Sequence, residues 1–235
     1  MRWIGRILGG VLALVLVVYL AMNLYAWFSA KNNKNAARER LTTQLTTALP
    51  AAREHQRQIA EALGPPDHSW RTQRCDVKTH DVGWMVQNYR QECQLQAIDA
   101  YAADSLEEAR ARLAAAPAEL VGDPSDEEAI GRCTTIRARA DDGSGQAGDT
   151  SVASVLVGPD PGGSEYWCGA GFAPSQYRPE QVVSGDHVSL DGDRSWLVVS
   201  RMQHLGSDSI GCSRWTVLFC SEPSGLPVFG SVNSR

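Results

Sequence analysis

The chain has 235 residues, of which 43% are hydrophobic and 21% are charged, and it contains six cysteines. This composition excludes a wholly disordered chain, a collagen-like repeat and a protein that crosses the membrane many times. The formal net charge is −5, but residues 31–63 carry six basic and three acidic side chains, whereas residues 64–235 carry 14 basic and 24 acidic ones. An acidic body argues against nucleic acid as a partner, because Lys and Arg must neutralise a phosphate backbone.

The first predicted element is a transmembrane helix over residues 7–30, a run of 24 residues without a charge. At 1.5 Å per residue such a helix is about 36 Å long, which is enough to cross a hydrocarbon core of about 30 Å. Aromatic residues near the two ends of the run fit the two membrane interfaces: Trp3, Tyr25 and Trp27. We expect an uncleaved signal anchor with a short cytoplasmic tip (residues 1–30 together), because Phe28 stands where a signal-peptide cleavage site needs a small residue.

Two signals for the orientation of this helix disagree. Four basic residues follow the span closely and two precede it, which by count alone would place the C-terminal side in the cytoplasm. All six cysteines follow the span, however, and disulfides persist outside the cytosol. We give the cysteines more weight and predict a cytoplasmic N-terminus and an extracytoplasmic C-terminal domain, anchored in the lipid bilayer through residues 7–30. Gly5, Gly9 and Ala13 are spaced four apart, which would let two spans pack closely as a weak homodimer.

Residues 31–66 predict a helical juxtamembrane stalk. Small and apolar residues recur at helical spacing, and Gly64-Pro65-Pro66 ends the helix. Pro50 interrupts the run, so two helices or one kinked helix are expected. Two interpretations are open: a spacer or weak coiled coil that lifts the body off the membrane, and a helix that packs on its own domain. The thin apolar stripe, with Gln56 where a heptad needs an apolar residue, favours the spacer.

The body, residues 67–235, predicts a disulfide-bonded α+β domain with a mainly antiparallel β-sheet and one or two helices. Its clearest strand is 86–101, where apolar and polar side chains alternate as they do on a half-buried strand. Other segments rich in β-branched and aromatic residues predict further strands over 69–77, 130–140, 151–158, 166–172, 196–202 and 214–220. The body is either one domain or two halves, 67–140 and 150–235.

One helix is predicted inside the body. Ser105 is followed three residues later by Glu108, which is the pattern of a capping box. Leu106 and Leu113 belong to its apolar stripe, and Pro117 ends it. We therefore expect a strand, a helix and a strand in the first half of the body.

The cysteines are an even set that allows 15 disulfide pairings. They are Cys75, Cys93, Cys133, Cys168, Cys212 and Cys220. Cys75 and Cys93 flank a plausible hairpin with a turn near residues 81–83, so we predict that these two pair. Cys212 and Cys220 look like a local pair, but an extended chain between them would hold them about 26 Å apart, far beyond the reach of a disulfide. Either that segment folds back, or these two pair with the remaining cysteines.

Few residues predict chemistry. Four polar residues gather around a Gly-rich turn: Asp186, His187, Asp191 and Asp193. Carboxylates can bind a hard cation, but the spacing of a calcium loop is absent, and Asp and Gly are the usual residues of turns. None of the five His forms a zinc pattern such as H-x-x-x-H. We therefore predict a surface turn here, and the sequence assigns no metal, cofactor or catalytic residue.

One short stretch carries a resemblance. Ser209-Ile210-Gly211-Cys212-Ser213-Arg214 resembles the Ser-His-Gly-Cys-x-Arg signature of L,D-transpeptidases, which cross-link peptidoglycan through a Cys nucleophile. The resemblance covers six residues, and Ile210 stands where the signature has His. It implies that Cys212 is a nucleophile with a nearby base such as His187. A catalytic Cys must be a free thiolate, so a structural disulfide at Cys212 is the competing interpretation.

The sequence as a whole favours a single-pass cell-envelope protein. Nineteen of the 22 basic residues are Arg, which together with the many Ala residues suggests a GC-rich bacterial genome. We expect a binding or interaction module without catalytic activity, whose partner is another envelope protein or a cell-wall component. The alternative is a cell-envelope enzyme, for example a Cys-dependent peptidoglycan-modifying activity at Cys212.

Overall fold

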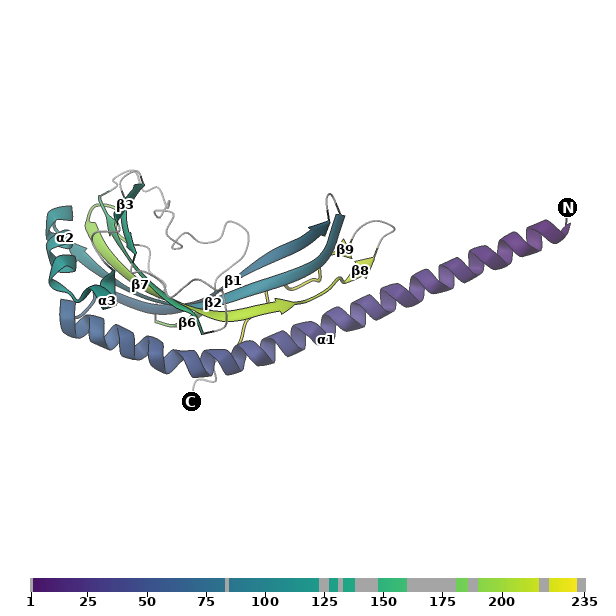
Figure 1. Ribbon diagram of the computed structural model, residues 1–235, viewed down its shortest axis with the longest axis horizontal. Helices are drawn as coiled ribbons and strands as arrows, with labels where there is room; N and C mark the ends of the chain where they lie inside the picture. The colour runs from purple at the N-terminus through teal and green to yellow at the C-terminus, as the bar shows by residue number, and fades with distance from the viewer. Residues whose placement is uncertain are drawn as a thin grey trace. The chain divides into compact units, whose positions relative to one another are not determined.

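The computed structural model describes residues 2–82, 85–122, 127–130, 133–137, 148–159, 181–185, 190–215 and 220–231. Its helices are α1 (Arg2–Leu63), α2 (Leu106–Ala115) and α3 (Ala118–Val121) (Figure 1). Its strands are β1 (His68–Val82), β2 (Met85–Ala103), β3 (Glu127–Ile130), β4 (Cys133–Arg137), β5 (Thr150–Val157), β6 (Gln181–Ser184), β7 (Ser195–Ser209), β8 (Arg214–Trp215) and β9 (Cys220–Ser221). These elements confirm the α+β class and the predicted apolar N-terminal helix.

The described strands form a seven-stranded sheet in the order β3-β4-β5-β7-β2-β1-β6, and a separate pair, β8-β9. The pairs β1/β6, β3/β4, β4/β5 and β5/β7 are antiparallel, as predicted. The single strand predicted over 214–220 is wrong, because Trp215 pairs antiparallel with Cys220 and the chain folds back between β8 and β9. The strand predicted over 166–172 lies outside the described residues.

The chain divides into two compact units. Unit 1 comprises Met1–Arg40, Val77–Glu92 and Ser207–Val228, and unit 2 comprises Leu41–Asp76, Cys93–Gly206 and Phe229–Arg235. The divisions fall inside α1, β1, β2 and β7, so each of these four elements contributes residues to both units. The predicted domain boundaries at residues 30 and 66, and the two halves of the body, stay predictions.

In unit 2 the helix α1 is part of the hydrophobic core. Leu41 and Leu45 are 1% and 0% exposed and pack in one cluster with Leu95 of β2 and Leu205 of β7. Further along the helix, Ile59 is buried in a second cluster that includes residues of α2 and β7. Burying a Leu side chain stabilises a fold by about 1.5–3 kcal/mol. The spacer interpretation is therefore wrong for α1 from Leu41 onward, and the alternative of a helix packed on its own domain is confirmed.

The helix α1 runs through Pro50 without interruption, so of the two expected alternatives two separate helices are wrong and a single helix is present. Proline lacks the N–H that would bond the carbonyl four residues earlier, which here belongs to Thr46. Pro50 and Thr46 both lie on the exposed face of α1, where water can hydrogen-bond that carbonyl. The thin apolar stripe that suggested a spacer consists largely of Ala and Leu, and small Ala side chains allow a helix to approach a sheet closely.

The predicted N-cap of α2 at Ser105 is confirmed, while Glu108 bonds the residue before the N-cap instead of the N-cap itself. The backbone N–H of Glu108 donates to Ser105 Oγ at 3.1 Å, and the Glu108 carboxylate accepts a hydrogen bond from the N–H of Asp104 at 2.8 Å. Arg112 contacts the same carboxylate at 3.0 Å and also donates to the carbonyl of Ala102 at 3.2 Å. These contacts fix the start of α2 against the end of β2, where the sequence pattern placed it.

Side-chain amides hold the C-terminal segment in each unit. In unit 1, Gln91 both accepts from the N–H of Val228 at 2.9 Å and donates to its carbonyl at 3.0 Å, much as a neighbouring strand would. In unit 2, the N–H of Gly230 donates to Gln73 Oε1 at 3.1 Å. A Cβ at Gly230 would lie 2.7 Å from the backbone of Leu41, so only glycine allows this close approach to α1.

Candidate functional site

The N-terminal part of α1 exposes apolar side chains on all sides. Apart from Tyr19, the large hydrophobic side chains from Ile7 to Phe28 are 49–76% exposed, and the helix is long and apolar enough to cross a membrane by length and composition.

 The most apolar part of this helix is not buried inside the protein at all. A helix that is hydrophobic all round is typical of a membrane span or of a deeply buried core helix, and this segment is not buried.

One face of the same helix is covered from Tyr19 onward. The half-buried and buried positions recur at helical spacing and are Tyr19, Asn23, Ala26, Ser29, Ala30, Asn33, Lys34 and Ala37. Ala26, Ala30 and Ala37 are 7%, 2% and 0% exposed. The described residues of Ser207–Val228, which we call the arm, include the partners of this face in unit 1. Small side chains at these positions allow the arm to approach the helix backbone.

Polar contacts connect the arm to α1 at successive levels. The N–H of Trp215 donates to Asn23 Oδ1 at 2.8 Å, and Asn33 Nδ2 donates to the carbonyl of Ile210 at 3.1 Å. Lys34 donates to the carbonyl of Ser224 at 2.8 Å, and Arg40 forms an ion pair with the buried carboxylate of Asp208. The stretch from Asp208 to Trp215 therefore follows α1 toward its apolar end.

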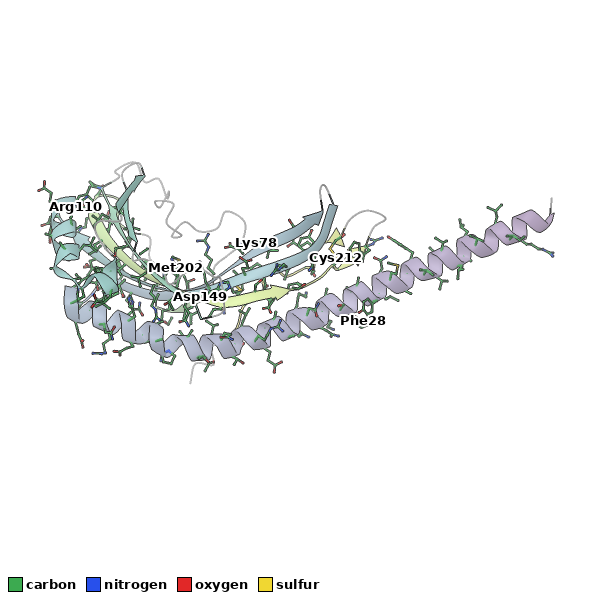
Figure 2. The ribbon with its side chains drawn as sticks, in the orientation of Figure 1. Phe28, Lys78, Arg110, Asp149, Met202 and Cys212 are labelled. Carbon is green, nitrogen blue, oxygen red and sulfur yellow. A yellow bond between two sulfur atoms is a disulfide. The ribbon has the colours of Figure 1, made fainter. Side chains whose placement is uncertain are left out.

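The structure describes the side chains of two of the three aromatic residues predicted at the membrane interface. Tyr25 and Trp27 are 76% and 49% exposed, and Lys31 Nζ lies 5.6 Å from the centre of the Trp27 ring. Phe28 contacts Trp27 edge to face, with 4.9 Å between ring centres, and in Figure 2 Phe28 and Cys212 lie on opposite sides of α1. The side chain of Trp3 lies outside the described residues. An interfacial role for the three residues stays a prediction.

Two disulfides are present in the described part of the chain. Cys75 pairs with Cys93 in unit 2, with an S–S distance of 2.03 Å, which confirms the predicted pair. Cys212 pairs with Cys220 in unit 1, with an S–S distance of 2.06 Å. The second pair forms because the chain folds back at β8 and β9, which is one of the two alternatives that the sequence left open. Cys168 and the side chain of Cys133 lie outside the described residues.

The stretch that resembles the transpeptidase signature, residues 209–214, lies within the arm. Ile210 is fully buried and its N–H donates to the carbonyl of Tyr89 at 2.8 Å. Ser213 closes the β8-β9 pair through its N–H, which donates to the carbonyl of Ser221 at 3.0 Å. Because the Cys212 sulfur is bonded to Cys220, it is not a thiolate, and these residues act as structural parts of the arm.

The predicted acidic turn is only partly described. Asp186 and His187 lie outside the described residues. Asp191 and Asp193 are exposed, the N–H of Asp193 donates to Asp191 Oδ1 at 3.1 Å, and the indole N–H of Trp196 donates to the carbonyl of Asp191 at 2.8 Å. These contacts are those of a surface turn. Among the described residues, no three His, Cys, Asp or Glu side chains come together in a way that could hold a metal ion.

A polar cluster in unit 2 joins α1 to three strands. Gln56 Nε2 lies 3.1 Å from both Ser69 Oγ of β1 and Asp99 Oδ1 of β2. Gln56 Oε1 accepts from Arg71 Nη1 at 2.6 Å, and Arg71 also contacts Ser184 Oγ of β6. The pairing of β1 with β6 shifts register just after Arg71, an irregularity of the kind that redirects a side chain. Gln56 is 7% exposed, so the cluster fixes the rotation of the helix on the sheet.

Two ionisable groups in unit 2 have shifted pKa values. Burial raises the pKa of Asp99 to about 6, against the opposing effects of hydrogen bonds from Ser69 and Gln56. Burial, together with the nearby charge of Arg201, lowers the pKa of His55 to about 4. Asp99 Oδ2 and His55 Nε2 have no hydrogen-bond partner among the described residues. Asp99 is only 1% exposed, so a substrate does not reach its carboxylate in this conformation.

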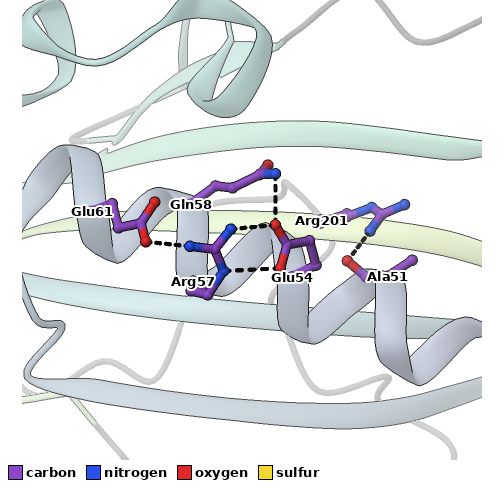
Figure 3. A network of polar contacts seen from close by, with 6 residues as sticks. All are labelled: Ala51, Glu54, Arg57, Gln58, Glu61 and Arg201. Carbon is purple, nitrogen blue, oxygen red and sulfur yellow. Dashed lines mark hydrogen bonds and ion pairs between the residues drawn. The ribbon is translucent and has the colours of Figure 1, made fainter.

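A third set of contacts lies where α1 crosses β7 in unit 2. Arg201 donates to the carbonyl of Ala51 at 2.6 Å, which ties the strand to the helix next to Pro50 (Figure 3). On the outer side of the helix, Arg57 is paired with Glu54 and Glu61 and is solvent-exposed. The pKa of Glu54 is lowered by its hydrogen bond from Arg57. The first contact belongs to the packing of the helix, and the second is a surface ion-pair network.

Sequence reasoning missed most of these contacts. Gln56 does not fit a heptad, and that misfit is the sequence signal for a buried polar cluster. Asn23 is an amide inside an otherwise apolar run, which was a comparable signal for a contact with another segment. Arg71 and Asp99 carry no local signal, because an isolated charge on a strand is more often exposed.

Comparison of the chain with protein-family models, with curated proteins and with solved structures finds no match.

Proposed function

We propose that this protein is a single-pass, membrane-anchored module of the cell envelope, which holds its α+β body on the extracytoplasmic side of the membrane. The observation that carries the proposal is the apolar surface of α1 from Ile7 to Val18, which is exposed around the helix. In water this surface would be unfavourable by about 25 cal/mol for each Å² of apolar area, whereas lipid tails cover it without other contacts.

One further observation supports the orientation, and a second supports the position of the membrane boundary. Both described disulfides lie C-terminal to the apolar segment, and structural disulfides persist outside the cytosol. Lys31 lies over the Trp27 ring at the C-terminal end of that segment, an arrangement that suits a membrane interface. The N-terminus would then lie in the cytoplasm, and residues 7–30 would contain the membrane span.

Extraction and labelling of the full chain in cell membranes test the anchor and its orientation. The protein should stay in the membrane pellet at alkaline pH, and a membrane-impermeant thiol reagent should label the cysteines of intact cells only after reduction. Replacing Val15 and Leu16 by Lys should release the chain into the soluble fraction, because charges at the centre of a span are unfavourable by about 2.5–3.5 kcal/mol each. Release of the unaltered chain at alkaline pH would contradict the anchor, and labelling only after cell lysis would contradict the orientation.

We further propose that the body acts by binding another envelope protein or a cell-wall component. The arm and the sheet are stabilised by disulfides and buried polar contacts, which suits a rigid display of a surface. Capture of the intact protein from gently solubilised membranes tests this proposal when it is paired with a chain whose residues 7–22 are replaced by an unrelated apolar span. A partner of the body should bind both chains, and a partner lost with the replacement would bind through the span instead.

A further inference from the structure

The fully exposed part of α1 is too short to cross a membrane alone. Every described side chain from Arg6 to Val18 is exposed, and the covered face begins at Tyr19. From Ile7 to Val18 the helix has a length of about 18 Å, and even from Trp3 its length is only about 24 Å. A typical hydrocarbon core is about 30 Å thick and needs about 20 residues. The bilayer must therefore include part of the region where the arm lies on α1.

The hydrogen bonds along α1 place the arm relative to this region. Trp215 bonds at the level of Asn23, whereas Ile210 bonds at the level of Asn33. These two levels are ten helical residues apart, or about 15 Å along the helix axis. A span of about 20 residues that begins at Ile7 ends near Ala26, so the level of Trp215 lies inside the membrane boundary and the level of Ile210 lies outside it.

The polar groups at the level of Asn23 are hydrogen-bonded in a way that suits a position inside the membrane boundary. Asn23 donates to the carbonyl of Tyr19 at 2.9 Å and accepts from the N–H of Trp215 at 2.8 Å. A polar amide and a strand N–H in apolar surroundings must hydrogen-bond to each other, because no water is present to take the place of either partner. Trp215 is half-buried and Arg214 beside it is exposed. A Trp next to an Arg is a pair suited to the boundary of acyl chains and phosphates.

We propose that the β8-β9 pair is a second membrane contact, which places Trp215 and Arg214 at the boundary between headgroups and acyl chains of the phospholipid bilayer. This inference rests on the proposed membrane anchor and adds a contact that the span alone does not make. The arm would limit tilting of α1, because the helix would be held at the membrane surface at two points. The Cys212–Cys220 disulfide would keep the β8-β9 pair folded at that surface.

Site-specific photocrosslinking to lipid tests the proposal in the full chain. A benzoylphenylalanine is placed at position 215, 16 or 224, and each chain is reconstituted in vesicles of phosphatidylcholine and phosphatidylglycerol. Position 16 is a positive control within the span. Ser224 is an exposed arm residue whose carbonyl bonds at the level of Lys34, farther from the apolar end, and it is the matched negative control. We expect lipid adducts at positions 16 and 215, with a yield at 215 several-fold above that at 224.

The outcomes separate the two proposals. Adducts at position 16 but not at 215 would overturn the second contact and leave the anchor intact, whereas the absence of adducts at position 16 would overturn the anchor itself. Asn23→Leu provides an independent readout, because it removes the acceptor of the Trp215 N–H without adding charge to the span. We expect it to lower the adduct yield at position 215 several-fold and to leave the yield at position 16 unchanged. An unchanged yield at position 215 would show that Asn23 does not position the β8-β9 pair.

Discussion

Unit 1 and unit 2 hold the same helix by different means. In unit 2, α1 contributes Leu and Ile side chains to large hydrophobic clusters. In unit 1 the buried cluster is small and is formed by Ala37, Ile210, Leu226 and Val228, while the contacts of α1 with the arm are hydrogen bonds, an ion pair and close approaches at Ala. The comparison teaches that unit 2 is stabilised mainly by burial, whereas unit 1 depends on a disulfide and on paired polar groups.

The largest expected effect tests the burial in unit 2. Leu45→Ala removes a side chain that is 0% exposed and should lower the free energy of unfolding by about 2–5 kcal/mol, through lost burial and the cavity that remains. Urea unfolding of the full chain in detergent micelles measures the change. Leu12→Ala is the matched control, because Leu12 is 75% exposed and should alter the free energy little. Equal effects of the two variants would mean that α1 is not part of the core and would restore the spacer interpretation.

The next expected effect is the pH dependence of stability that two buried groups give unit 2. The raised pKa of Asp99, about 6, gives stability that is present at low pH and is lost as pH rises from about 4 through 6. The lowered pKa of His55, about 4, acts in the opposite direction, because its stability is lost as pH falls from about 6.5 through 4. The two contributions oppose each other over the same pH interval, so the stability of the unaltered chain should depend on pH less than either contribution alone would make it.

Neutral variants separate the two opposing titrations. In Asp99→Asn only the His55 contribution remains, so stability should rise with pH between 4 and 6.5. In His55→Gln only the Asp99 contribution remains, so stability should fall with pH over the same interval. Urea unfolding at several pH values measures both slopes, and the double variant serves as the control with neither. Two single variants with the same flat profile would contradict the burial of these groups.

The disulfide of the arm tests whether the two units are stabilised separately. Replacing both Cys212 and Cys220 by Ser removes a link across eight residues and should destabilise the arm by about 2–3 kcal/mol. Hydrogen exchange should then be faster at arm amides such as Ile210, and unchanged in unit 2. The matched control replaces Cys75 and Cys93, and should accelerate exchange in unit 2. If either double variant accelerated exchange throughout the chain, the two units would unfold as one.

The sequence predicted the regular parts of this molecule better than its contacts. The N-cap at Ser105 and the pairing of Cys75 with Cys93 followed from local patterns, because a few neighbouring residues determine each. The fold-back between Cys212 and Cys220 was only one of two alternatives, since β-branched and aromatic residues suit either one strand or two short ones. The packing of α1 was wrongly predicted, because a thin stripe of Leu and Ala does not reveal whether a sheet covers it.

The candidate site was even less predictable. The apolar run over residues 7–30 was evident, because membrane spans are determined by composition over many neighbouring residues. The contact between Asn23 and Trp215 joins residues 192 positions apart, and that between Gln56 and Asp99 joins residues 43 apart. Taken alone, each of these residues could equally lie on the protein surface. Only the fold brings such side chains together, so local patterns could raise the question at Gln56 but not answer it.

The smallest expected effect separates two arginine contacts of the same helix in unit 2. Arg57 and its partners Glu54 and Glu61 are all about half exposed or more, so Arg57→Gln should leave stability unchanged within error, because water screens exposed ion pairs. Arg201 is half-buried and bonds the carbonyl of Ala51, so Arg201→Gln should lower the free energy of unfolding by about 1 kcal/mol. Urea unfolding at low and high salt measures both. A larger loss for Arg57→Gln than for Arg201→Gln would mean that surface charge, rather than contact with the sheet, holds this part of α1, and unit 2 would then resemble unit 1 in its dependence on polar pairs.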